Sequence, residues 1–268
     1  MATCSLTTAG AQTLRLRADK ELHEATNDWP VSFRYGFGSD FADTRTPRAW
    51  NNALGLSFGH NLSEHWSAAV DLGVSAVFVD GKIDKDKQET YAETVNPSTA
   101  LGLEYGRPFF GRHNWTFGVS VEPLWDEPSR IEGYKGIAGA YTGVTFKLFS
   151  KMYTMSHTLS FSNLINSFPY DSEGGSNPDY FYIYGFSNSI RFLKTYKAFY
   201  NFGIKMTRYL DGFLSYNYTN TIGLGRSWDK TTVSLTYENG GFTENGDFSL
   251  WYLDRYRRLV RLNIGYSF

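Results

Sequence analysis

The ten residues from Leu259 to Phe268 constrain the fold of this chain more than any other stretch. Apolar side chains occupy one parity and polar or small side chains the other: Val260, Leu262, Ile264, Tyr266 and Phe268 against Arg261, Asn263, Gly265 and Ser267. Because successive side chains of a strand point to opposite faces of a sheet, this alternation predicts a β-strand with one apolar face. An edge strand of a soluble β-protein would show the same pattern, so the rest of the chain must decide.

Similar alternating runs recur from Val31 onwards and predict about twelve strands in all. The lengths of the connections between them depend on whether the preceding run is even- or odd-numbered. Those after the even-numbered runs are short, and most of those after the odd-numbered runs are longer, notably residues 80–96 and 167–179. The two-residue hairpin signal Asp211-Gly212 is the exception on the long side. Short turns at one rim and long loops at the other are typical of an up-and-down membrane barrel, whereas a soluble sandwich has no reason to sort its connections.

With this support, the last strand resembles the closing strand of bacterial outer-membrane β-barrel proteins, which alternates and ends in an aromatic residue as Phe268 does here. The resemblance implies an all-β fold, a closed antiparallel up-and-down transmembrane β-barrel of about twelve strands over residues 31–268. It also implies a location in the bacterial outer membrane, contact with outer-membrane lipid, and recognition by the assembly machinery. That recognition would use the apolar parity of the strand: Val260, Leu262, Ile264, Tyr266 and Phe268. No narrower family is indicated, and the oligomeric state is not predicted.

Composition agrees with a barrel. No stretch approaches the roughly 20 apolar residues that a membrane helix requires, while aromatic residues make up 18% of the chain. Several of them lie beside predicted short turns, where they would form an interfacial girdle: Trp66, Tyr105, Trp115, Tyr153, Phe192 and Tyr266. Residues 1–11 contain Ala9-Gly10-Ala11, which resembles the end of a signal peptide, so we expect a signal-peptide remnant or a disordered tag there. Residues 12–30 are polar and are expected to form a periplasmic or plug segment.

Charge and ligand-type residues exclude several functions. A net charge of −1 offers no electrostatic basis for binding nucleic acid. Cys4 is the single cysteine, and neither a phosphate-binding glycine loop nor a metal-type spacing of His and Cys is present, so we predict no cofactor and no metal.

The polar parity of the strands predicts the residues that face the lumen. Acidic residues are expected on neighbouring strands three to five, and basic residues mainly on strands eight, nine, twelve and one, so that an acidic wall faces a basic wall. The predicted pore-lining residues are Arg34, Asp71, Glu104, Glu122, Lys147, Arg191, Lys205, Arg255, Arg257 and Arg261. In porin-like proteins opposed acidic and basic walls set up a transverse field across a constriction, and the resemblance implies the same arrangement here. Alternatively, these groups form ion pairs that close the lumen.

An inward-facing aromatic group is expected near the mouth with the long loops. It consists of Phe181, Tyr209, Phe213 and Trp251, accompanied by two aliphatic residues, Ile183 and Leu253. These side chains would contact a solute entering the pore. Alternatively, the strand ends that carry them project above the membrane and pack under the loops.

Three functions follow from these patterns. The first is an outer-membrane channel for passive diffusion of small polar or charged solutes. The second is a closed structural or surface-interaction barrel that binds a partner through its long loops. The third is a barrel hydrolase acting at the outer rim. We predict that the chain is not an enzyme, because none of its histidines lies in a predicted outer loop, where general-base chemistry would need one: His23, His60, His65, His113 and His157.

Overall fold

The computed structural model describes residues 31–40, 48–80, 91–110, 113–124, 129, 131, 133–149, 152–170, 174–193, 195–243 and 258–267. Twelve strands lie within these residues: β1 Val31–Asp40, β2 Arg48–Asn61, β3 Trp66–Asp80, β4 Tyr91–Phe109, β5 His113–Pro123, β6 Tyr134–Leu148, β7 Tyr153–Asn166, β8 Pro178–Phe192, β9 Tyr196–Tyr209, β10 Leu214–Trp228, β11 Thr231–Thr243 and β12 Arg258–Ser267. The residues predicted to form a signal remnant or tag (1–11) and a periplasmic or plug segment (12–30) lie outside this description.

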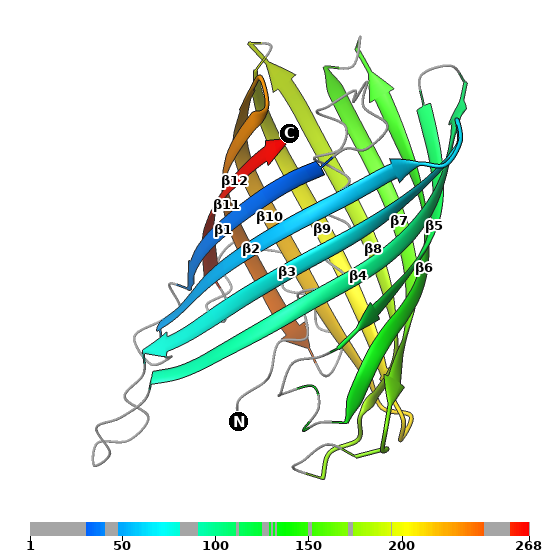
Figure 1. Cartoon of the computed structure of the whole chain (residues 1–268), viewed down its shortest axis with the longest axis vertical. Helices are drawn as coiled ribbons and strands as arrows, with labels where there is room; N and C mark the ends of the chain where they lie inside the picture. The colour runs from blue at the N-terminus through cyan, green and yellow to red at the C-terminus, as the bar shows by residue number, and fades with distance from the viewer. Residues whose placement is uncertain are drawn as a thin grey trace.

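The strands form one closed antiparallel barrel in which each pairs with its neighbours in sequence. Figure 1 shows the strands strongly tilted around a common axis. The ring is closed by β1 and β12, where Phe33 pairs with Tyr266 and Tyr35 with Ile264. The predicted up-and-down barrel of about twelve strands is therefore confirmed.

The connections alternate as the sequence predicts. Those after β2, β4, β6, β8 and β10 contain two to four residues, and the others are longer except the hairpin between β9 and β10. Gly212 in that hairpin has a φ of 90°, a left-handed conformation that favours glycine. We call the rim with the short turns the inner rim and the opposite rim the outer rim.

The apolar parity of each strand faces outward. Large aliphatic side chains on it are exposed, among them Leu54 on β2, Leu101 on β4, Leu159 on β7, Leu224 on β10 and Leu262 on β12. A soluble protein rarely exposes so continuous an apolar surface, which instead suits the lipid-facing band of a membrane barrel. The opposite parity consequently faces the lumen.

Aromatic residues gather on the outer surface near the inner rim, as predicted. The Tyr105 ring lies 5.2 Å from Trp66 and 5.9 Å from Trp115, measured between ring centroids. Farther around the barrel, Phe192 stacks on Tyr196 at 5.7 Å. Rings with one apolar and one polar edge are favourable at the depth of lipid headgroups, so these contacts mark one membrane interface.

Strand boundaries at the outer rim differ from the sequence prediction. Three strands extend into segments predicted as loops: β2 begins at Arg48, β4 begins at Tyr91, and β11 continues to Thr243. Outside the lipid band, the backbone ladder can continue without an apolar side-chain parity, and for that reason alternation underestimates the strands. The sequence also favours a long final strand that begins at about Asp247, but residues 247–257 lie outside the described residues. No helix in the described part of the chain is long and apolar enough to cross a membrane.

Candidate functional site

The barrel wall presents mostly small side chains to the lumen. Along β7 the inward parity reads Thr154, Ser156, Thr158, Ser160 and Ser162. The inward parities of other strands also carry small residues, such as Gly185, Ser187 and Ser189 on β8. Inward hydroxyls pair along the wall, as Thr145 and Ser156 do at 3.0 Å. Side chains fill the interior of a barrel of about eight strands, and a twelve-stranded one is wider.

A charged network crosses β1, β2 and β3 on the lumenal face. The Arg34 guanidinium donates a hydrogen bond to Ser57 Oγ at 2.9 Å, and the Ser57 hydroxyl donates in turn to Asp71. Arg34 Nη2 also lies 3.6 Å from an Asp71 carboxylate oxygen, and the two side chains are 30% and 22% exposed. Two predicted pore-lining residues thus form an ion pair, held along the wall by a serine between them.

A second ion pair joins β11 and β12. Arg261 Nη1 lies 3.8 Å from a carboxylate oxygen of Glu238, whose side chain is almost fully buried. Sequence reasoning did not select Glu238, because the Asn- and Gly-rich residues that follow it, from Asn239, are typical of a loop. The sequence does contain a signal for Glu238. It has the opposite parity to the apolar residues Val233, Leu235 and Tyr237 on the same strand and therefore faces the lumen.

Glu104 on β4 is bound by a tyrosine from two strands away. The Tyr141 hydroxyl donates to a Glu104 carboxylate oxygen at 2.9 Å. Gly118 on the intervening β5 makes this contact possible, because a Cβ added there would overlap the Tyr141 ring. The ring therefore lies along the wall across Gly118. Sequence reasoning missed Tyr141, because regular alternation of large apolar residues on this strand begins only with Val144, after Gly143.

The predicted aromatic group near the outer rim is partly described. Phe181 is buried in a lumenal cluster with Tyr134 and Leu164, and Leu124, Ile137 and Ile183 pack against it. The Lys205 ammonium lies 3.7 Å from the centre of the Phe181 ring. Tyr209 and Phe213 flank the β9–β10 hairpin with ring centroids 5.7 Å apart. The fourth predicted member, Trp251, lies outside the described residues.

The remaining predicted pore-lining residues occupy both ends of the lumen. Glu122 is buried near the outer end of β5, Lys147 lies near the inner end of β6, and Arg191 is exposed at the inner end of β8. Arg255 and Arg257 lie outside the described residues. Acidic and basic groups are thus partly intermixed, because Arg34 and Arg261 each have a carboxylate neighbour.

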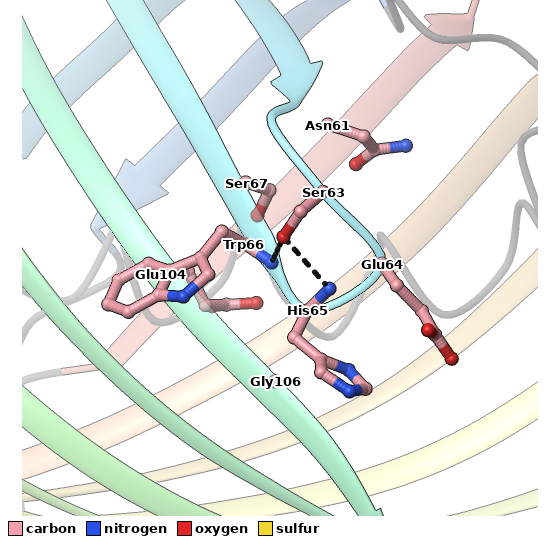
Figure 2. A pocket seen from close by; sticks show the side chains of 8 residues that line it. All are labelled: Asn61, Ser63, Glu64, His65, Trp66, Ser67, Glu104 and Gly106. Carbon is pink, nitrogen blue, oxygen red and sulfur yellow. Dashed lines mark hydrogen bonds between the residues drawn. The ribbon is translucent and has the colours of Figure 1, made fainter.

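An open polar pocket lies at the inner rim (Figure 2). Its volume is about 480 Å³, and it is lined by the β2–β3 turn, from Asn61 to Ser67, together with Glu104 and Gly106 on β4. The turn is held by Ser63 Oγ, which accepts a hydrogen bond from the Trp66 backbone amide at 3.2 Å. The pocket thus gathers polar side chains of the β2–β3 turn beside Glu104 at the inner end of the barrel wall.

Groups suited to metal binding are not assembled in the described residues. They contain no cluster of three or more His, Cys, Asp or Glu side chains that could hold a metal ion. His157 lies on the lipid-facing side of β7, where its Nδ1 is 2.8 Å from the Tyr184 hydroxyl. The residue two positions on, which a lipid-facing serine hydrolase would use, is Leu159.

Comparisons with known proteins place this geometry among outer-membrane barrels. No protein-family description matches the sequence, and no curated protein does. The structure of an outer membrane channel from Pseudomonas putida F1 matches with a TM-score of 0.66 at 10% identity, covering 91% of this chain and 97% of the channel. The NanC porin matches with a TM-score of 0.55 at 10% identity, covering 89% and 100% respectively.

A KdgM porin in complex with disordered oligogalacturonate has a TM-score of 0.54 at 12% identity, covering 88% of this chain and 99% of the porin. At these identities the likeness establishes a shared fold. The chain therefore has the fold of a bacterial outer-membrane β-barrel protein, as the resemblance of its last strand implied.

Proposed function

We propose that this barrel is a passive channel for small polar or charged solutes. The observation that carries the proposal is the lumenal wall, where hydroxyl-bearing side chains and glycines predominate on most strands. Such a wall is hydrophilic and leaves space for water. A closed barrel of this width would have to fill that space with bulkier side chains. The solved structures named above, which are a channel and porins, are consistent with this role.

The charged groups of the lumen would select among solutes. Glu104 and Glu122 lie on β4 and β5, whereas Lys205 lies on β9, four to five strands away in the ring of twelve. Groups of opposite sign on nearly opposite walls orient dipolar solutes that pass between them. The ion pairs of Arg34 and Arg261 contribute less to this field, because a neighbouring carboxylate offsets each positive charge.

Planar-bilayer recording of the refolded full chain tests the proposal. We expect stepwise conductance, and the reversal potential in a salt gradient will report ion selectivity. Folding should be established first by heat-modifiable migration in a detergent gel. A folded, inserted barrel without conductance steps would refute the channel. It would favour the closed interaction barrel, for which deletion of residues 81–90 or 167–177 should abolish partner binding.

The hydrolase alternative has a separate test. Purified barrel in mixed micelles should not release fatty acid from phospholipid or lipid A, nor cleave a peptide substrate. Turnover that is lost when a carboxylate at the outer rim is neutralised would favour the enzyme over the channel.

A further inference from the structure

Lys205 differs from the lumenal arginines that form ion pairs. Arg34 and Arg261 have carboxylate oxygens at 3.6 and 3.8 Å. Within the described parts of the barrel, Lys205 has no carboxylate neighbour and its ammonium lies over the Phe181 ring. A cation over an aromatic face gains less than the withdrawal of an ammonium from water costs. The Phe181 ring therefore compensates the Lys205 ammonium only in part, and a counter-anion would supply the remainder.

Hydrogen-bond donors lie beside Lys205 on the same face. The β8–β9–β10 register pairs Lys205 with Asn217, and pairs Thr207 with Ser215 one step nearer the outer rim. Ser215 is 1% exposed, and its hydroxyl has no hydrogen-bond partner among the described residues. Buried hydroxyls normally have such a partner. The Ser215 hydroxyl is thus a hydrogen-bond donor that the described residues leave unused.

The third component is apolar. Phe181 and Ile183 on β8 pair with Thr207 and Lys205, so an aromatic and an aliphatic side chain border the ammonium on its other side. Both belong to the lumenal cluster that includes Leu164. One cation, a row of neutral donors and an apolar border together suit a small anion with a carbon skeleton better than a bare inorganic ion.

We propose that Lys205, Asn217 and the hydroxyls of Thr207 and Ser215 form a binding site for the carboxylate of a small organic anion. The site lies in the outer half of the lumen, since β9 reaches the outer rim at Tyr209, four residues beyond Lys205. Solutes of this class are then the preferred cargo of the channel. The preference for cargo rests on the proposed channel function, whereas binding of the anion does not.

Calorimetric titration of the refolded full chain in detergent tests the binding site directly. Gluconate serves as the probe, and sorbitol, which has the same six-carbon chain without a charge, serves as the control ligand. We expect gluconate to bind and sorbitol not to bind. Lys205→Gln should weaken gluconate binding by at least about tenfold, the loss expected when a charged hydrogen-bond donor is removed. Lys205→Arg should retain most of the affinity.

Lys197→Gln is the matched control variant. Lys197 lies on the same strand and faces the lumen near the inner rim, so its loss changes the net charge equally but leaves the proposed site intact. Equal affinity in wild type and Lys205→Gln, or equal weakening by both substitutions, would overturn the site. In bilayers, Lys205→Gln should lower the anion-to-cation permeability ratio. A silent barrel that still binds gluconate through Lys205 would refute the channel while leaving the site standing.

Discussion

The hydroxyl of Tyr141 on β6 donates a hydrogen bond to Glu104 on β4 at 2.9 Å, reaching across the intervening β5. The close approach depends on Gly118, the β5 residue under the Tyr141 ring, where a Cβ would overlap the ring atoms. The ring therefore covers a glycine on the wall and holds in place a carboxylate that lines the inner-rim pocket. A side chain as large as tyrosine is accommodated without projecting across the lumen.

Gly118→Ala should destabilise the barrel by about 1–3 kcal/mol, because the added methyl group displaces the Tyr141 ring and breaks its bond to Glu104. The free energy of unfolding, from urea titration in lipid vesicles, measures the effect. Gly102→Ala is the control, since a Cβ at that lumenal position on β4 would make an ordinary contact at 3.8 Å. Equal losses in the two variants would show that the Tyr141 contact does not require Gly118.

The Arg34–Asp71 pair should show a coupling of about 1 kcal/mol in a double-mutant cycle. Both side chains are less than one third exposed and share Ser57, so the coupling should exceed that of a fully exposed pair. Arg34→Gln and Asp71→Asn, alone and combined, are compared by urea unfolding in vesicles. Losses that simply add would mean that the two groups do not interact.

Alternation along the strands was sufficient to predict the barrel, its strand number and the sorting of its connections. It also selected Arg34, Asp71 and Arg261 as lumenal, because parity alone assigns a face. Parity says nothing about partners, which depend on register between strands. The pairs of Asp71 with Arg34, of Glu238 with Arg261 and of Glu104 with Tyr141 became visible only once neighbouring strands were aligned. The predicted recognition of the last strand by the assembly machinery stays a prediction.

The His157–Tyr184 pair on the lipid face should behave as an internally satisfied polar unit. Replacing one partner by phenylalanine leaves the other polar group facing hydrocarbon, and each single substitution should cost about 1 kcal/mol. The double variant His157→Phe/Tyr184→Phe should lie within about 0.5 kcal/mol of wild type, because no polar group is then left alone. Thermal unfolding in detergent measures the stability of the three variants. A double variant that is less stable than either single variant would contradict this prediction.

Two arginines on the outer surface predict the preferred bilayer thickness. Near the outer rim, Arg208 donates to the Tyr180 hydroxyl at 2.6 Å. Near the inner rim, Arg226 lies 5.1 Å from the rings of both Tyr196 and Trp228. Arg226 pairs with Tyr196, which precedes Arg208 by twelve residues on β9. At about 3.4 Å per residue and a strand tilt of about 40°, the levels of Arg208 and Arg226 are roughly 30 Å apart along the membrane normal.

Thermal stability should therefore be highest in phosphatidylcholine bilayers with a hydrocarbon core of about 25–30 Å, and lower in thinner or thicker ones. Refolding into a series of saturated chain lengths measures the optimum. Arg208→Gln/Arg226→Gln should flatten the dependence, whereas Arg191→Gln, at a lumenal position of the inner rim, should leave it unchanged. A stability that does not vary with chain length would contradict this assignment of the membrane boundaries.

The seam between β1 and β12 has a consequence for biogenesis. Ser32 pairs with Ser267, so the contacts that close the ring join residues more than two hundred positions apart. Partners this distant in sequence meet slowly, because the chain between them must lose conformational entropy before any contact compensates for that loss. Until they meet, β1 and β12 each have an edge of unpaired backbone N–H and C=O groups, to which lipid hydrocarbon offers no hydrogen bonds. We therefore expect ring closure and insertion to be coupled in one late, cooperative step, so that a chain truncated before residue 258 should remain open and be a substrate for proteolysis.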